Sequence, residues 1–246
     1  MSAISYVYTF LFYAATVLLV GGLVRKIYIY AKTPAPLKIP TTPAPVTKAG
    51  VVYRMFKEVV LFESLFKGNK PTWLFAFLFH FGLLLVLIRH TRYFVEHVPS
   101  LIVMVQWAGV YAGMAMVAGL LGLFARRIVV DRVRYISSPS DYLMLLLLIS
   151  IGVTGLGMKY VSHTDIVQVK AFFLGLMRFD WQSIPSDAIL LIHLALVAIL
   201  MMLFAYSKLL HGVGIFFSPT RNQVDNSRDK RHIADWAKPL DKTSGQ

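Results

Sequence analysis

Four histidines lie inside two apolar segments of this chain, His80 and His90 in the first and His193 and His211 in the second. A strongly polar side chain in a lipid-spanning helix is costly, so such residues generally have a partner. An imidazole can find that partner in iron, because histidine is a common metal ligand and an axial ligand of haem. The paired pattern predicts two bis-histidine haem sites, although each histidine alone could be a hydrogen-bonded packing residue.

The spacing of the four histidines predicts how they pair. On ideal helices, the ten-residue step from His80 to His90 covers ~15 Å, and the eighteen-residue step from His193 to His211 covers ~27 Å and returns to the same face. If the two helices are antiparallel, His80 pairs with His211 and His90 with His193. The unequal steps require tilted helices. Because the chain has no cysteine, a C-x-x-C-H attachment is excluded and both haems would be b-type.

The elements that carry these residues are predicted to be membrane helices. Hydrophobic residues make up 57% of the chain, and several apolar runs are long enough to cross a ~30 Å hydrocarbon layer. We expect an all-α integral membrane protein with five spans, at 5–24, 72–90, 101–124, 141–159 and 186–210. The first span lacks a preceding basic region and is followed by Arg25 and Lys26, so we expect it to be retained rather than cleaved.

The basic residues predict the orientation. Of the 25 Lys and Arg, five lie on the side that holds residues 89–92 and 159–178, and the other twenty lie on the opposite side. The positive-inside rule then places the N-terminus outside and the C-terminus in the cytoplasm. His80 and His211 become the inner pair, and His90 and His193 the outer pair. The net charge of +13 reflects this topology and contact with anionic lipid, and we do not expect nucleic-acid binding.

Residues 1–216 are predicted to form the five-helix cytochrome b domain, and residues 217–246 a polar cytoplasmic tail. The cytoplasmic loop at 31–70 begins with five prolines between 32 and 45, which predict an extended linker or docking arm. An amphipathic interfacial helix is expected next, on apolar residues at helical spacing: Val52, Met55, Phe56, Val59, Phe62 and Phe66. On the outer side, the apolar centre of 160–187 predicts a short surface helix.

A bis-histidine haem has both axial positions filled, so electron transfer is the chemistry that remains. A quinone would supply the organic chemistry, and its pocket needs polar groups in an apolar slot. The outer end of the second span offers His97 and Tyr93 as quinone contacts. Guanidinium binds carboxylate well, so Arg89 and Arg92 are candidates for haem propionates, with Lys208 as the matching inner candidate.

The sequence around these residues resembles the gamma subunit of respiratory nitrate reductase. The resemblance runs over about 71–216 and rests on HFGLLLVLIRH at 80–90, AG at 108–109, ARR at 125–127, SDY at 140–142, LIH at 191–193 and SKLLH at 207–211. It implies a five-helix dihaem cytochrome b that oxidises quinol near the outer haem and passes electrons to a cytoplasmic iron–sulfur subunit. It also implies His80 with His211 for the inner haem, and His90 with His193 for the outer.

The proline-rich loop, the segment at 50–66 and the short basic tail are similar to the DsrM subfamily, the membrane cytochromes b of Dsr sulfur-metabolism complexes. This similarity implies a bacterial cytoplasmic-membrane protein, a DsrK-like iron–sulfur partner, and further membrane and periplasmic subunits including a multihaem cytochrome c. It implies quinone or menaquinone as the substrate. One departure concerns the lysine that nitrate reductase gamma subunits place near the start of the third span. No lysine lies between Val95 and Lys159, so the quinone pocket is expected to be built differently.

A different class of function, a proton or metal transporter with a histidine relay, uses the same residue type. It predicts acidic partners within the spans, and Asp and Glu are absent from the apolar parts of all five. The expected function is therefore that of the quinone-reactive electron-transfer subunit of a membrane oxidoreductase.

Overall fold

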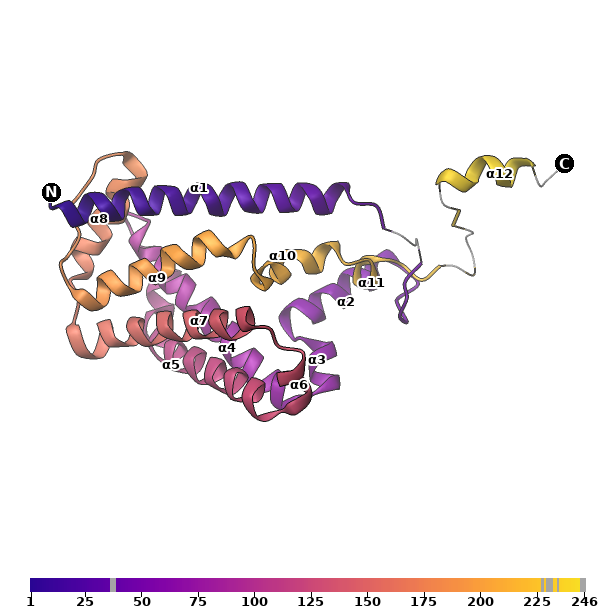
Figure 1. The fold of residues 1–246 in the computed structure, drawn as a ribbon, viewed down its shortest axis with the longest axis horizontal. Coiled ribbons are helices and arrows are strands. Elements are labelled where there is room, and N and C mark those ends of the chain that lie inside the picture. The colour runs from indigo at the N-terminus through magenta and orange to yellow at the C-terminus, as the bar shows by residue number, and fades with distance from the viewer. Residues whose placement is uncertain (36–38, 227, 229–231, 234, 244–246) are drawn as a thin grey trace. The chain divides into compact units, whose positions relative to one another are not determined.

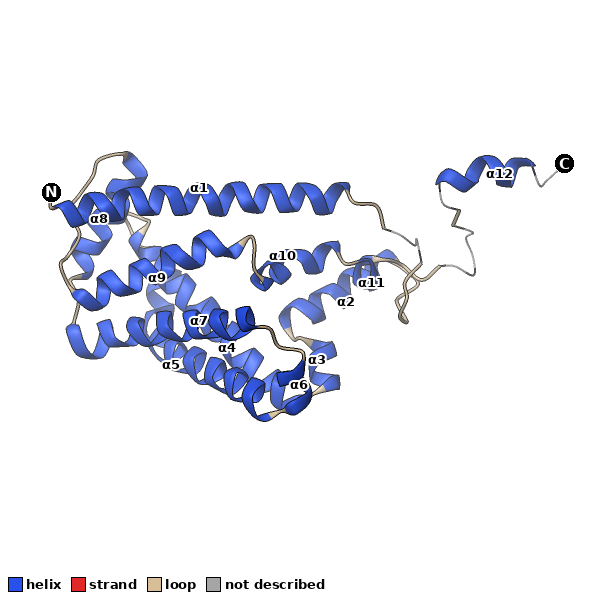
Figure 2. Cartoon of the chain, viewed as in Figure 1, coloured by secondary structure: helices blue, strands red, loops and turns tan. Residues whose placement is uncertain are grey.

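The computed structural model describes residues 1–35, 39–226, 228, 232–233 and 235–243, and this part of the chain contains helices and no strand (Figure 2). The all-helical prediction is confirmed for it. Four helices are long and apolar enough to cross a membrane: Ala3–Lys32, Lys70–Tyr93, Ser100–Val129 and Pro139–Ser162. They correspond to the first four predicted spans, so the chain is a multi-pass membrane protein.

The fifth predicted span is interrupted. Helix α9 (Ala188–Phe204) ends before His211, and helix resumes at the 3-10 turn Lys208–Leu210 and α10 (His211–Gly214). Ser207 accounts for the break, because its hydroxyl donates to the Phe204 carbonyl at 3.1 Å and accepts from the Leu209 amide at 3.2 Å, in competition with the helical pattern. The prediction of one continuous helix over 186–210 is wrong, and ideal helical spacing does not relate His193 to His211. The chain has five spans only if both pieces form one crossing.

The chain divides into two compact units, one of residues 1–19 with 65–203 and the other of residues 20–64 with 204–246. In the first unit, α4 (Lys70–His90) packs along α5 (Ser100–Val129), and α7 (Pro139–Gly157) packs against α5 (Figure 1). Glycines allow the close approach of α4 and α5. A Cβ at Gly82 would lie 2.7 Å from the Ala112 carbonyl oxygen, and one at Gly119 would lie 2.6 Å from the Phe75 carbonyl oxygen.

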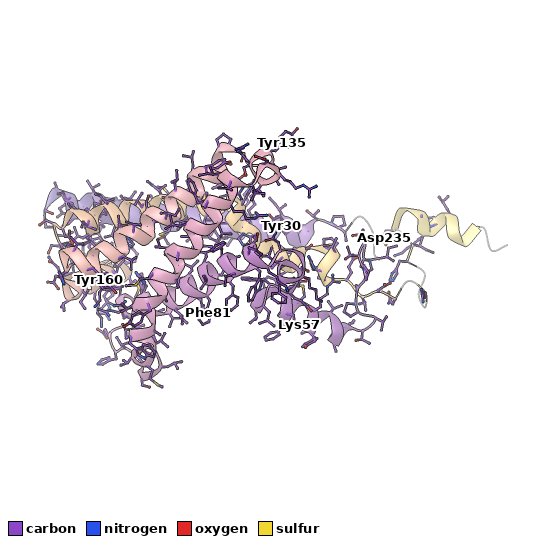
Figure 3. All side chains as sticks on the ribbon, turned by 90° about the horizontal axis from the view of Figure 1, so that it is seen from below. Tyr30, Lys57, Phe81, Tyr135, Tyr160 and Asp235 are labelled. Atoms are coloured by element: carbon purple, nitrogen blue, oxygen red, sulfur yellow. The ribbon has the colours of Figure 1, made fainter. Side chains whose placement is uncertain are left out.

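The start of α7 is fixed by a capping box, in which the Ser138 hydroxyl and the Asp141 carboxylate satisfy the first turn. Just before α7, Tyr135 is 91% exposed, whereas Tyr160 lies in the five-residue π-helical turn Met158–Ser162 that continues α7. These two tyrosines mark the opposite ends of α7 in Figure 3. The start of α9 is capped by Asp187, whose carboxylate accepts from the Ile189 amide at 3.0 Å.

Helix α8 (Ile166–Arg178) forms part of the core of the first unit. The expected surface helix is present and is amphipathic: Phe172 on its inner face is only 1% exposed, whereas Val167 on its outer face is 74% exposed. Its apolar residues pack with Phe12 of α1 (Ala3–Lys32) and with Leu190 and Leu194 of α9. This packing ties the start of α9 to the start of α1.

In the second unit, α2 (Lys48–Val60) is amphipathic, as predicted, but it is shorter than expected. Phe62 has a left-handed backbone (φ 51°), and α3 (Glu63–Gly68) begins immediately after it. The prediction that one helix continues to Phe66 is therefore wrong. The corner is held by the Glu58 carboxylate, which accepts from the Ser64 amide at 3.2 Å and from the Ser64 hydroxyl.

The proline-rich segment precedes α2. Residues 36–38 lie outside the described part of the chain, and residues 39–45 are not helical, as predicted. The tail beyond residue 217 contains the short helices α11 (Pro219–Asn222) and α12 (Lys238–Thr243). Its Asp225 amide donates to the Pro45 carbonyl at 2.9 Å, and this bond joins the tail to the proline-rich segment within the second unit.

Candidate functional site

Helix α4 itself orients two of the four histidines. The Nδ1 atom of His80 lies 2.8 Å from the Ala76 carbonyl oxygen, and that of His90 lies 2.7 Å from the Val86 carbonyl oxygen. A carbonyl oxygen only accepts, so each Nδ1 carries the hydrogen and each Nε2 carries the lone pair. Both rings are therefore set by the backbone four residues earlier in their own helix.

His193 is held by a neighbouring helix. Its Nδ1 lies 2.9 Å from Oγ1 of Thr154, on α7. The single hydroxyl hydrogen of Thr154 is donated to the carbonyls of Ser150, at 2.7 Å, and Ile151, at 3.1 Å. Donation from His193 Nδ1 to the hydroxyl oxygen preserves these bonds, so we assign the hydrogen of His193 to Nδ1 as well. The ring also lies beside Gly155, where a Cβ would be in van der Waals contact with His193 Cε1 at 3.4 Å.

His211 begins α10 in the second unit, and its Nδ1 lies 2.8 Å from the Lys208 carbonyl oxygen. It too has its hydrogen on Nδ1. His80 lies in the first unit, so the inner pairing of His80 with His211 stays a prediction. The other predicted pair, His90 and His193, lies within one unit, and the two rings are close enough to interact electrostatically.

All four candidate ligands thus share one tautomer, with Nε2 as the atom that can coordinate a metal. This is the arrangement that ligating histidines adopt when a second group fixes the other ring nitrogen. Among the described residues, no group of three or more His, Cys, Asp or Glu could hold a metal ion. Sites with only two protein ligands suit haem iron, for which the macrocycle supplies the other ligands, and the residues present fit that group.

A cleft of about 690 Å³ opens beside His90 in the first unit. Its lining combines basic, amide and aromatic side chains with an apolar wall: Arg89, Arg92, Tyr93, Val98, Val103, Gln106, Trp107, Val110, Lys159, Ile166, Val167 and Lys170. An apolar slot with a few polar groups is the usual form of a site for a small organic ligand. Among the described residues that line the cleft, four are cationic and none is acidic.

The structure distributes the remaining predicted site residues unevenly. Arg89, Arg92 and Tyr93 line the cleft, and the Tyr93 ring lies 5.8 Å from the ring of His90. His97 is exposed in the loop before α5 and does not line the cleft. Lys208 is exposed in the second unit, where its carbonyl orients His211. The roles predicted for all five residues stay predictions.

The basic wall of the cleft is built by contacts between α4 and α5. The stem of Arg89 crosses α5 at Gly109, where a Cβ would lie 2.8 Å from Arg89 Cδ. Arg92 Nη1 donates to Gln106 Oε1 at 3.1 Å, and its guanidinium lies 5.2 Å from the Tyr93 ring centroid. The close approach of the Arg89 stem explains why residue 109 is a glycine. The hydrogen bond to Gln106 and the contact with the Tyr93 ring fix the position of Arg92.

A loop after the 3-10 turn Thr91–Tyr93 is fastened to α8. Lys170 Nζ donates to the Glu96 carbonyl at 2.7 Å, and Arg178 forms an ion pair of 2.8 Å with the Glu96 carboxylate. The hydrogen bond from Arg178 holds the pKa of the Glu96 carboxyl below its ordinary value. The loop that carries His97 is therefore anchored on the side of the cleft formed by α8.

Four residues of the cleft were not among the predicted site residues: Lys159, Lys170, Gln106 and Trp107. The two lysines reach the cleft from the end of α7 and from α8, far from the second span in sequence. The outer-side placement of Lys159 and Lys170 was the available signal. Only the fold brings them beside Arg89.

The chain is similar in sequence to known proteins. The family model described as nitrate reductase gamma subunit matches residues 63–225. A protein of Archaeoglobus fulgidus described as an Hdr-like menaquinol oxidoreductase cytochrome b-like subunit is 35% identical, over 91% of this chain and 81% of its own length. A protein of Archaeoglobus profundus with the same description is 33% identical, over 96% of this chain and 84% of its own length.

Proposed function

Since this chain belongs to the nitrate reductase gamma subunit family, we propose that it is the dihaem cytochrome b subunit of a membrane menaquinol oxidoreductase. Menaquinol is the substrate that the descriptions of both relatives name. In this proposal, His90 and His193 hold an outer haem and His80 and His211 an inner one. Electrons are exchanged with quinol at the outer side and with a partner subunit in the cytoplasm.

The observation that carries the proposal is that the four histidines share one tautomer. Each is hydrogen-bonded through Nδ1 and presents Nε2 as its coordinating atom. His90 with His193 and His80 with His211 would each hold one b-type haem, and these haems would supply reversible one-electron transfer. A shared tautomer that leaves Nε2 to coordinate is what four iron ligands of the same kind require.

The cleft beside His90 supports the quinol half of the proposal. Quinol releases two protons with its two electrons, so its hydroxyls need hydrogen-bond partners that can pass protons on. Lys159 and Tyr93 supply such groups, and Trp107 with Val103 supplies an apolar wall. Lys159 comes from the end of α7, so it offers a lysine to the cleft although the start of the third span has none.

The partner is proposed from the relatives. Their description as Hdr-like agrees with an iron–sulfur subunit related to heterodisulfide reductase, such as the DsrK-like partner that the DsrM resemblance implies. We place this subunit on the cytoplasmic side, where the positive-inside rule puts His80 and His211. A Dsr-type sulfur-metabolism complex is our specific proposal, and a nitrate reductase is the alternative within the same family.

Spectroscopy of the purified chain tests the haem assignment. Reduced-minus-oxidised spectra should show a b-type α band, and pyridine haemochrome should give about two haems per chain. His193→Ala should remove one haem and leave the other, and His80→Ala should remove the complementary one. Absence of the α band would favour the histidine-relay transporter.

Quinol kinetics test the cleft separately. Lys159→Gln should raise KM for a menaquinol analogue and leave the haem spectra unchanged, because the lysine lines the cleft without being a ligand. Lys26→Gln is the matched control, since it removes one charge elsewhere. Equal kinetics of wild type and Lys159→Gln would exclude a role for Lys159 in binding quinol.

A further inference from the structure

A second pocket lies in the second unit, where α2 meets α11 and the proline-rich segment. It has a volume of about 370 Å³ and is lined by Thr42, Pro43, Arg54, Ser64, Thr220 and Arg221. All of these residues belong to that unit. Two guanidinium groups and three hydroxyl groups therefore converge on a small space that the proposed electron transfer does not use.

Arg54 provides the strongest evidence that this pocket binds a ligand. Its Nη1 atom is buried and has no hydrogen-bond partner among the residues that the structure describes. A guanidinium is charged at any physiological pH and carries five N–H donors. A buried donor without an acceptor is costly, and more so when it is charged. The side chain thus lacks an acceptor at the pocket that it lines.

The second guanidinium of the pocket, that of Arg221, is held in place by Glu58 and Ser64. Its Nη1 donates to Glu58 Oε1 at 2.7 Å and to Ser64 Oγ at 2.8 Å. Glu58 is only 8% exposed, so this ion pair fixes the Arg221 guanidinium and offsets one positive charge. The charge of Arg54 remains, and the pocket has an excess of one cation.

We propose that this pocket binds a phosphate group. A phosphate offers several acceptor oxygens to forked guanidinium donors and to the hydroxyls of Thr42 and Thr220. It would accept from Arg54 and neutralise the excess charge. The inference concerns a site outside the haem and quinol machinery and does not depend on the proposed function.

The phosphate could be free or part of a lipid headgroup. The exposed apolar face of α2 supports the lipid headgroup as a source. The surface of α2 opposite the pocket exposes Val52 (70%), Phe56 (56%) and Val60 (46%). An amphipathic helix with such a face lies in the membrane interface, where anionic phospholipids present their phosphates. Both sources share the same recognition chemistry.

The test uses the full-length protein in dodecyl maltoside, a detergent without phosphate, with and without phosphatidylglycerol, and with inorganic phosphate or chloride at equal ionic strength. The unfolding temperature is measured for wild type, Arg54→Gln and Arg54→Lys. Lys48→Gln is the matched control, since it removes an exposed charge from the same helix. Phosphate at about a hundredfold above Kd should raise the wild-type unfolding temperature by several degrees.

A rise with inorganic phosphate supports the free anion, and a rise only with phosphatidylglycerol supports the headgroup. Arg54→Gln should lose the rise, Arg54→Lys should show it at higher ligand concentration, and Lys48→Gln should behave as wild type. If Arg54→Gln does not fold, Arg54→Lys decides. The proposal is overturned if wild type responds to neither ligand, or if an Arg54 variant that folds responds as wild type does. An equal loss of response in Lys48→Gln, which would indicate a general charge effect, also overturns it.

Discussion

Replacing Thr154 with valine should weaken the outer haem site and leave the inner one intact. The substitution preserves the shape of the side chain but removes the oxygen that accepts from His193 Nδ1 at 2.9 Å. His193 is only 7% exposed, so water has little access to replace that oxygen. The other three candidate ligands keep their acceptors, which are backbone carbonyls.

The size of the effect follows from the burial of the ring. A buried donor left without an acceptor costs about 1–3 kcal/mol, which agrees with the roughly tenfold to hundredfold loss of metal affinity seen when a group supporting a ligand is removed. The Ile151 carbonyl also interacts with the His193 ring, so we expect a loss at the lower end of this range. The cost falls on the orientation of His193, because the ring can rotate or shift its hydrogen to Nε2. Either change means that the Nε2 lone pair is no longer available in the position from which it would coordinate iron.

Haem content and redox-titrated spectra of purified Thr154→Val measure this effect. The spectrum should lose or shift the component that His193→Ala also removes, and keep the component that His80→Ala removes. Thr154→Ser restores the hydroxyl and should restore the outer site. A Thr154→Val spectrum identical to wild type, or an equal loss of both components, would refute the reasoning.

Two further predictions concern packing and pH. Gly119→Ala should lower the free energy of unfolding by about 1–3 kcal/mol, because its Cβ would lie 2.6 Å from the Phe75 carbonyl oxygen. Chemical unfolding measures this loss. Gly21→Ala is the control and should cause no such loss, because its Cβ would have nothing within 4 Å. The lowered pKa of Glu96 means that its ion pair with Arg178 stabilises the fold above the ordinary carboxyl pKa of 4.5 and ceases to do so as the pH falls through the folded-state value. The difference in unfolding temperature between wild type and Glu96→Gln should therefore shrink on acidification, and a constant difference would contradict this.

The sequence predicted the helical class and the first four spans because apolar length is a strong local signal. It failed at the fifth span, where the apolar run continues past Phe204. The break depends on which backbone groups the Ser207 hydroxyl bonds. Hydrophobic periodicity does not reveal that these bonds compete with those of the helix. The same limitation applies at Phe62, where the periodicity continues although the backbone turns.

The candidate site was predictable where it depends on residues near His90 in sequence. Arg89, Arg92 and Tyr93 were identified from their proximity, and they line the cleft. Lys159 and Lys170 could not be identified from the sequence, because their position beside the cleft depends on how α8 and the end of α7 pack in the first unit. Likewise, α8 lies in a loop that is polar at both ends, and its burial becomes evident only when Phe12 and Leu190 pack on it.

The way in which the histidine rings are held has a consequence for the order of events during synthesis of the chain. His80 and His90 bond to carbonyls of α4, so both rings can be oriented as soon as that helix forms. His193 depends on Thr154, which belongs to a helix made earlier. When α9 emerges from the ribosome and inserts, its acceptor on α7 is already in the membrane. The proposed outer site is then completed by docking of α9, whereas the half of each proposed site that belongs to α4 is formed in advance.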